Sequence, residues 1–408
     1  MSAPLPLQGV KVLEFSHTIM GPCAGLVLAD LGADVVKIEP APTGDHTRRL
    51  PGFAAGFFAT FNRNKRSLAL DLKQPEGRAA CHRLVAEADV LLENYGPGTM
   101  ERLGCGWEQL RAVNPRLVYL ALKGFLAGPY EHRPALDEVV QFQAGLAYMT
   151  GPPGRPLRAG ASIIDILGAV FGVVAVLSAL RQRDATGPGG GEGQRVCSSL
   201  FESAVFLVGS HMAGAAATGE PPPPMPARRG AWGIYDVFDT AGAEGESHQL
   251  FIGVTSDQQW VRFTEAFGLT EMAADPRIAT NAQRAGARSW LIPALQEVFL
   301  RFDQAEVARR CEAAGISWAP VGKPVDLFED PHLAAGGGLL QTAISALGGG
   351  ALFGLPALPL EFGEDRARVT LRRQPPRMGE HNAEVLAEGG FTAAEIAALE
   401  AKRVIVAA

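Results

Sequence analysis

Apolar and polar positions in the first half of the chain alternate in a regular way. Residues 9–15 (GVKVLEF) and 33–39 (ADVVKIE) are short apolar runs, typical of buried strands. Between them, residues 21–32 have the length and pattern of a helix that ends at a glycine. A strand, a helix and a second strand at this spacing indicate a βαβ unit, so the sheet should be parallel. The same pattern predicts further strands at 89–95 and 116–125 and further helices at 75–88, 137–149 and 163–180.

The pattern changes after a proline-rich stretch, residues 219–230 (GEPPPPMPARRG), which we interpret as an extended crossing between domains. Beyond it, one strand is predicted at 248–256 and amphipathic helices at 257–268 and 291–302. The tail, residues 379–405, is again helical. We therefore predict the first part of a large domain at 1–200, a linker at 201–229, a smaller α+β domain at 230–325, and a return segment at 326–408 that completes the large domain.

One apolar run, Ile163 to Leu180, is barely long enough to cross a membrane. It carries Asp165 near its start, and a charged side chain in lipid is costly. Small residues at Gly168 and Gly172 suit the close packing of a buried helix. We interpret the run as a core helix and predict no membrane partner.

Composition narrows the possible functions. The chain has 408 residues, of which 47% are hydrophobic and 20% charged, and its formal net charge is −6. This balance is typical of a globular protein that is too long for one core. The acidic balance argues against nucleic acid as a partner. Five scattered cysteines without a CxxC pair, and a start without a secretory signal, predict a cytoplasmic protein.

The signatures of several common ligand sites are missing from the sequence. It has no G-x-G-x-x-G after the first strand, no Walker A pattern, no G-x-S-x-G and no metal-ligand spacing. We therefore expect no metal and no tightly bound cofactor. Polar residues do follow the predicted strands, at the carboxyl ends where parallel sheets bind their ligands. These segments are residues 16–22, 40–49, 94–98 and 123–137.

Asp137 closes the last of these segments and begins a predicted helix. One interpretation is a helix N-cap, because an aspartate oxygen can satisfy a free N–H of the first turn. The other is a nucleophile, since the helix dipole at this position favours the charged carboxylate. The residues around Asp137 leave both interpretations open.

Nine stretches in order along nearly the whole chain carry a family resemblance. They include LQGVKVLEFSHTIMGPCAGLVLADLGADVVKIEP, FNRNKRSLALDLKQPEGR, ADVLLENYGPGTMERLG, DEVVQFQAGLAYMTG and WAPVGKPVDLFEDPHL. Together they resemble the class III CoA-transferases, the family of formyl-CoA transferase, carnitine CoA-transferase and the α-methylacyl-CoA racemases. The resemblance implies an α/β fold: a large Rossmann-like parallel-sheet domain built from both chain ends, a smaller α+β domain, and a dimer of interlocked chains.

The resemblance also assigns roles to single positions. Asp137 matches the nucleophilic aspartate of the family. Positions that bind CoA are matched by His17, Lys65, Arg66, Asn94, Tyr95, Arg102 and Lys123. Fixed Arg and Lys donors suit the phosphates of CoA, whereas Tyr95 has two open interpretations, stacking on adenine or packing in the core. Candidates for contact with the acyl group or the acceptor acid are Ile19, Arg48, Arg228 and Arg229, the arginines as anchors of a second carboxylate.

The implied reaction moves CoA from a short acyl-CoA, such as succinyl-CoA, to a small carboxylic acid. It proceeds through mixed anhydrides and an aspartyl-CoA thioester, with CoA as a substrate. One alternative is an acyl-CoA racemase or epimerase, for which Asp165 matches the second carboxylate but Leu136 stands in place of a histidine. Another alternative is one subunit of a heteromeric CoA-transferase. We therefore expect a homodimer, or a pair with a homologous subunit.

Overall fold

The computed structural model describes residues 5–187, 190–227, 230–242, 248–344 and 351–407. Contacts within the chain divide it into two units, Met1–Pro226 with Phe328–Ala408, and Ala227–Leu327. The second unit falls close to the interval 230–325 drawn from the sequence. Arg228 and Arg229, two of the candidate carboxylate anchors, lie outside the described residues.

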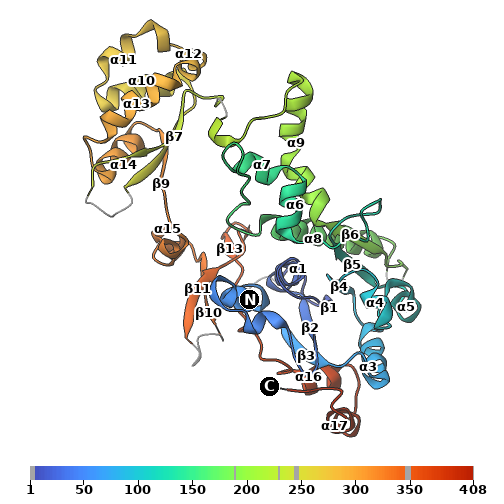
Figure 1. Ribbon diagram of the computed structural model, residues 1–408. Helices are drawn as coiled ribbons and strands as arrows, with labels where there is room; N and C mark the ends of the chain where they lie inside the picture. Colours follow the sequence, from blue (N-terminus) through green and yellow to red (C-terminus); the bar gives the residue numbers. More distant parts are fainter. Residues whose placement is uncertain (1–4, 188–189, 228–229, 243–247, 345–350, 408) are drawn as a thin grey trace. The chain divides into compact units, whose positions relative to one another are not determined.

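The first unit contains a six-stranded sheet in which every strand is parallel to its neighbours. Its strands are β1 (Lys11–Phe15), β2 (Asp34–Pro40), β3 (Arg66–Leu70), β4 (Val90–Glu93), β5 (Val118–Lys123) and β6 (Arg195–Ser199). They lie in the order β3-β2-β1-β4-β5-β6 (Figure 1), which confirms the predicted α/β fold with a parallel sheet. The strand order reverses between β1 and β4, and sheets of this kind bind ligands outside the carboxyl ends of the strands at that switch point.

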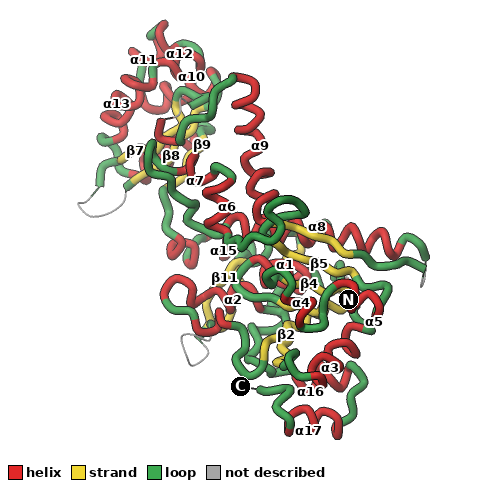
Figure 2. The backbone as a smooth tube through the Cα atoms, turned by 45° about the vertical axis from the view of Figure 1, so that its right-hand side comes forward, coloured by secondary structure: helices red, strands yellow, loops and turns green. Residues whose placement is uncertain are grey.

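Two apolar layers cover the sheet, because successive side chains of a strand point to opposite faces. Val12 packs in the layer of α1 (Met20–Asp30) and α8 (Ile163–Asp184), whereas its neighbour Leu13 packs in the opposite layer. The opposite layer receives α3 (Pro75–Val85), α5 (Trp107–Val113), α16 (Asn382–Glu388) and α17 (Ala393–Ala401). Figures 1 and 2 both show α16 and α17 beside α3. The C-terminal segment therefore completes the core that the N-terminal segment begins.

Further elements of the first unit connect or extend these layers. They are η1 (His46–Arg49), η2 (Gly52–Gly56), α2 (Phe57–Asn62), α4 (Thr99–Arg102), α6 (Asp137–Gln143), α7 (Leu146–Thr150), α9 (Leu200–Thr218), α15 (Pro331–Ala335), β10 (Leu339–Ala343), β11 (Leu352–Pro356), β12 (Glu361–Phe362) and β13 (Ala367–Arg368). The single helix predicted at 137–149 is two helices, α6 and α7. Gly145 between them has a φ of 82°, a left-handed conformation that an α-helix cannot continue through.

Two helices in the described part of the chain, α8 and α9, are long and apolar enough to cross a membrane by length and composition alone. The buried side of α8 packs on the sheet, where Ile164 and Val173 share an apolar layer with Leu120 and Leu122 of β5. A Cβ at Gly172 would lie 2.8 Å from Leu122, so a small residue is needed for this approach. The contacts of α8 are those of a core helix.

The second unit has its own antiparallel sheet and its own apolar core. Strands β7 (Ile234–Asp239), β8 (Gln249–Val254) and β9 (Ser317–Pro320) pair in the order β7-β8-β9. Its helices are α10 (Asp257–Phe267), α11 (Thr270–Ala274), α12 (Asn281–Gly286), α13 (Arg288–Phe299) and α14 (Gln304–Ala313). Phe263, Phe299 and Val307 from three of these helices pack with Ile252 of β8. The strand and the two helices predicted from the sequence correspond to β8, α10 and α13.

Candidate active site

The turn after β1 and the loop after β4 form a crevice at the switch point of the sheet. The main chain of His17 and the side-chain amide of Asn94 form a reciprocal pair. The His17 N–H donates to Oδ1 at 3.0 Å, and Nδ2 donates to the His17 carbonyl at 2.9 Å. Gly21 permits this approach, because a Cβ there would lie 2.4 Å from Ser16 and 2.9 Å from Asn94. Loops from two neighbouring strands are thereby fixed together at the carboxyl edge of the sheet.

Aromatic rings line the same crevice. The imidazole of His17 stacks on Tyr95, with centroids 5.5 Å apart, and meets His46 edge-on at 5.4 Å. Burial lowers the pKa of His17, and the neighbouring His46 acts in the same direction. Burial raises the pKa of Tyr95 to about 12. Both rings are therefore mostly neutral at pH 7 and suit stacking or hydrogen bonding better than pairing with a phosphate charge.

Lys123, at the end of β5, already has partners within the chain. Its ammonium group forms an ion pair with Glu93 and donates to the carbonyl of Tyr95 at 3.0 Å. Burial raises the pKa of Glu93, although Lys123 acts against this rise. Lys123 lines the pocket described next, but Glu93 balances its charge.

A pocket of about 420 Å³ includes this crevice and the N-termini of α6 and α8. One group of lining residues follows the strands: His17, Asn94, Tyr95 and Lys123. A second group comes from the two helix N-termini and the loop between them: Asp137, Glu138, Arg158, Ser162 and Asp165. Ile19, a predicted contact, adds apolar surface. The pocket thus joins residues expected to meet CoA with several carboxylates, among them Asp137 and Asp165.

Asp137 is the first residue of α6, but its carboxylate caps a different helix. Oδ2 accepts the backbone N–H groups of Ile164 at 2.8 Å and Asp165 at 3.0 Å, both in the first turn of α8. Oδ1 accepts a hydrogen bond from the side-chain amide of Gln141. Both oxygens are engaged, and only 3% of the residue is exposed. The capping chemistry expected of Asp137 is present, but it serves a helix that begins much later in the sequence.

Asp165 is the third residue of α8 and, like Asp137, has a carboxylate that lines the pocket. Among the described residues, its carboxylate has no hydrogen-bond or ion-pair partner. Burial raises its pKa to about 7, and the carboxylates of Asp137 and Glu138 add to the rise. A carboxylate that lines a pocket with a strongly raised pKa and no partner is a candidate for chemistry.

Lys65, expected to bind CoA, is fully buried against α1 and does not line the pocket. Its ammonium group pairs with Glu14 at 2.7 Å and donates to the Pro22 carbonyl at 2.9 Å. Burial lowers its pKa to about 8. Lys65 therefore joins the strand and the helix of the first βαβ unit, and its donors are not offered to a ligand.

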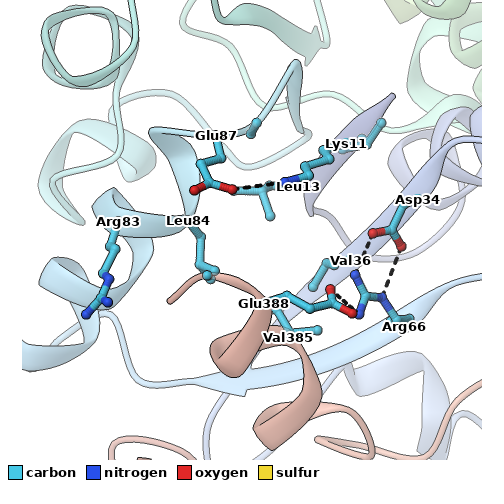
Figure 3. A pocket seen from close by; sticks show the side chains of 13 residues that line it. Lys11, Leu13, Asp34, Val36, Arg66, Arg83, Leu84, Glu87, Val385 and Glu388 are labelled. Atoms are coloured by element: carbon cyan, nitrogen blue, oxygen red, sulfur yellow. Dashed lines mark hydrogen bonds and ion pairs between the residues drawn. The ribbon is translucent and has the colours of Figure 1, made fainter. Parts of the chain in front are cut away.

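Arg66, the other expected CoA contact of this stretch, begins β3 at the amino edge of the sheet. Figure 3 shows its guanidinium between Asp34 and Glu388, and the pair with Glu388 measures 2.7 Å. The hollow at this edge has a volume of only about 50 Å³. Strand-end ligands bind at the opposite, carboxyl edge, so Arg66 is an ion-pair partner for the C-terminal helix α16.

Arg48, a predicted carboxylate anchor, already has partners within the protein. Arg48 forks onto Glu39, with Nη2 and Nε at 2.6 and 2.8 Å, and its guanidinium lies 3.6 Å from the ring centre of Phe58. Its donors are used inside the protein, which argues against a role as carboxylate anchor.

Arg102 ends α4 on the surface, where Nη2 donates to Thr99 at 2.9 Å. No described residue forms an ion pair with Arg102, so its charge is available to a phosphate.

Comparisons with known proteins show the family of the chain. A sequence profile of CoA-transferase family III matches residues 7–382. The chain belongs to CoA-transferase family III. An acyl-CoA transferase of Fusarium pseudograminearum is 34% identical over 96% of this chain and 86% of its own. The succinate–glutarate CoA-transferase of Agrobacterium fabrum is 32% identical over 94% of this chain and 95% of its own. The crystal structure of a CaiB/BaiF family protein of Brucella suis has a TM-score of 0.81 at 31% identity, covering 95% of this chain and 100% of that one.

Membership of the class III CoA-transferases sets the reaction class, transfer of CoA between carboxylic acids, and makes CoA thioesters its substrates. Within the described ranges, no group of three or more His, Cys, Asp or Glu side chains is placed to hold a metal ion.

Several side chains at this CoA-transferase site were not among the predicted ones, and Gln141 and Arg158 are two of them. Gln141 lies one helical turn after Asp137, and this i,i+4 spacing was a readable signal that the two share a helix face. Arg158 lies in an irregular segment without periodicity, so the sequence carried no sign that it lines the pocket. It lies 3.5 Å from Glu138, the residue next to Asp137.

Proposed function

We propose that this CoA-transferase moves CoA from succinyl-CoA or a similar short acyl-CoA to a small carboxylic acid, and that Asp165 carries the covalent intermediate. The main support is the contrast between Asp137 and Asp165, two of the carboxylates that line the pocket. The oxygens of Asp137 accept hydrogen bonds from Gln141, Ile164 and Asp165, whereas no described residue contacts the Asp165 carboxylate in this way. We therefore assign the nucleophile to Asp165 instead of Asp137, which the resemblance had suggested.

Burial makes the carboxylate of Asp165 a stronger nucleophile than a carboxylate in water. Water solvates a free carboxylate strongly, and removal of this shell leaves a more basic oxygen. With a pKa of about 7, roughly half of the Asp165 side chains are ionised at neutral pH. Basicity and ionised fraction are balanced best when the pKa lies near the working pH.

Each step of the transfer conserves an activated acyl bond. An oxygen of Asp165 attacks the thioester carbonyl of the donor, the C–S bond breaks, and a mixed anhydride and CoA thiolate result. The thiolate attacks Cγ of Asp165, the donor carboxylate leaves, and an aspartyl-CoA thioester forms. The acceptor carboxylate attacks the same Cγ, expels the thiolate and forms a second anhydride. The thiolate then attacks the acceptor carbonyl, which releases the new acyl-CoA and the Asp165 carboxylate without net uptake or release of a proton.

Arg158 supports a dicarboxylic substrate. Arg158 lines the same pocket as Asp165, and its ion pair with Glu138 is 3.5 Å long and partly exposed. Such a pair leaves guanidinium donors for a bidentate contact with a second carboxylate. The name of the Agrobacterium relative, which refers to succinate and glutarate, points to the same class of acids. We propose that Arg158, in place of Arg48, anchors the far carboxylate.

We also propose that the chain works as a dimer, as the resemblance implies. Neighbouring helices α6, α8 and α9 expose large apolar side chains, among them Phe142, Val174 and Phe206, the last with 70% of its surface exposed. Exposed apolar surface of this kind is typical of faces that are covered in an assembly. Light scattering over a dilution series should show a dimer. A stable, active monomer would contradict this part of the proposal.

Trapping of the intermediate tests the proposed chemistry. After incubation with succinyl-CoA and hydroxylamine, mass spectrometry should find a hydroxamate on the peptide that contains Asp165. Asp165→Asn should yield none and should lose transfer activity. A hydroxamate on Asp137 would show that Asp137 is the nucleophile. Exchange of the α-proton of an acyl-CoA with solvent deuterium, without CoA transfer, would favour the racemase alternative, since His132 also lines the pocket.

A further inference from the structure

Two buried side chains of α6, Asp137 and Gln141, hold the segment that carries Asp165. They are one helical turn apart and lie on the same face of the helix. Asp137 Oδ2 accepts the N–H groups of Ile164 and Asp165 at 2.8 and 3.0 Å, and Gln141 Oε1 accepts the N–H of Ala159 at 2.9 Å. The Gln141 amide also donates to Asp137 Oδ1. The two side chains are therefore hydrogen-bonded to each other, and together they accept hydrogen bonds from the backbone of residues 159–165.

The first turn of α8 depends on these hydrogen bonds from Asp137 and Gln141. Its N-cap residue, Ser162, makes no side-chain cap hydrogen bond, and the first N–H groups of a helix have no acceptor within the helix. Residues 151–162, which lead into α8, form neither helix nor strand. Without Asp137, two N–H groups would lose their acceptor and the orientation of Asp165 would depend on an irregular segment.

We propose that Asp137 and Gln141 are positioning residues, which hold the first turn of α8 so that Asp165 faces the bound thioester. The inference rests on the proposed role of Asp165 as the nucleophile. Such control matters because a misplacement of about 1 Å can slow a reaction about 100-fold. The role differs from a nucleophilic one, since Asp137 acts here through hydrogen bonds to the backbone of α8.

Asp137 also contributes to the electrostatic surroundings of Asp165. The charged and titratable groups around the site are Asp137 and Glu138 on α6, Cys23 on α1, Arg158 in the preceding loop, and His17, Tyr95, Lys123, Glu131, His132 and Arg133 in the rest of the pocket lining. After burial, the carboxylate of Asp137 contributes most to the raised pKa of Asp165. Moving this negative charge away should let Asp165 ionise at lower pH. A substitution that leaves the charges around Asp165 in place should leave that ionisation unchanged.

A double variant in which the side chains at 137 and 141 exchange their roles as donor and acceptor separates a positioning role from a general loss of stability. In Asp137→Asn, the amide oxygen can still accept from α8, but its NH₂ group faces the NH₂ group of Gln141. The additional change Gln141→Glu supplies a carboxylate that accepts from this amide and can still accept the N–H of Ala159. The double variant thus keeps all the hydrogen bonds, with one of them reversed, and moves the negative charge one side chain further from Asp165.

The experiment compares wild type, Asp137→Asn, Gln141→Glu and the double variant in kcat, in the pH profile of kcat/KM and in hydroxamate trapping. We expect Asp137→Asn to lower kcat by about 10- to 100-fold while the hydroxamate still forms on Asp165. The double variant should recover most of this loss, with the acid limb of its profile at lower pH than in wild type. Gln141→Glu alone places two carboxylates face to face and should move the acid limb to higher pH. Glu108→Gln, an exposed acid on α5, is the matched control and should change nothing.

Two different failures can be told apart. If the double variant recovers nothing over Asp137→Asn, or the acid limb stays in place in all variants, the positioning role is refuted while Asp165 remains the nucleophile. If the wild-type hydroxamate forms on Asp137, the proposed function fails, and the positioning role fails with it. Gln141→Glu retains Asp137, so it still tests the electrostatic part if Asp137→Asn does not fold.

Discussion

Replacing Asp165 by asparagine should stabilise the protein while it removes activity. The pKa of this half-buried carboxyl is raised from 3.8 to about 7, so the folded state holds the proton more tightly than the unfolded chain does. The favourable contribution of the protonated group is complete below pH 3.8 and is lost as the pH rises through about 7. An amide at this position carries no charge and avoids the cost of an ionised group near Asp137 and Glu138.

The size of the effect follows from the difference between the two pKa values. One pKa unit corresponds to about 1.4 kcal/mol, so a rise from 3.8 to about 7 corresponds to at most about 4 kcal/mol at pH 8. Local relaxation and the exposed part of the carboxyl group reduce this value. Half of it, about 2 kcal/mol, corresponds to roughly 3 °C in Tm for the first unit, because the shift per kcal/mol falls as the unit becomes larger. The same relation predicts that the stabilisation falls by more than half between pH 8 and pH 5.

Scanning calorimetry of wild type and Asp165→Asn at pH 8 and pH 5, at one protein concentration, measures this difference. The variant should melt higher at pH 8, and its advantage should be much smaller at pH 5. Glu297→Gln, which removes an exposed acid of α13 that has no ion pair among the described residues, is the control and should not change Tm. A variant that is no more stable than wild type at pH 8, or equally stabilised at both pH values, would show that Asp165 is not held as a buried charge.

Three further predictions concern the cations. Arg158→Gln should raise KM for succinate or glutarate by about 10- to 100-fold and leave KM for acetate nearly unchanged, because one charge-assisted contact is lost; an equal effect on both kinds of acid would contradict the anchor. Arg66→Ala should lower Tm without changing the Kd of CoA in calorimetry, since its partners are Asp34, Glu384 and Glu388, and weaker CoA binding would contradict this. Arg102→Ala should weaken CoA binding about tenfold or more at low salt and less at high salt, as expected for an exposed cation on a phosphate; an unchanged Kd would mark it as an ordinary surface charge.

Much of the fold was determined by local pattern. The apolar runs at 9–15, 33–39, 89–95 and 116–125 predicted parallel strands, and they correspond to β1, β2, β4 and β5 of the observed sheet. The strands β3 and β6 were not predicted from the pattern. The polar residues after these strands had to meet at one edge, because the carboxyl ends of parallel strands lie side by side. His17 and Asn94, which are far apart in sequence, accordingly bond to each other. The sequence alone also carried the motifs by which the chain resembles its family.

Only the tertiary structure shows how the partners of Asp137 and Asp165, and those of the candidate cations, differ. Asp137 and Asp165 each begin an apolar helix in the sequence, and nothing local shows that the first caps the helix of the second. Lys65 and Arg66 stand in one basic motif, yet Glu14 and the C-terminal helix α16 engage their charges. The physical reason is that the reactivity of a charged side chain depends on its solvation and its partners, and the partners come from distant parts of the chain. Arg66 and Glu384 are 318 residues apart in the sequence, and Asp137 and Ile164 are 27 residues apart. Only the folded chain brings the members of each pair close enough to form a hydrogen bond.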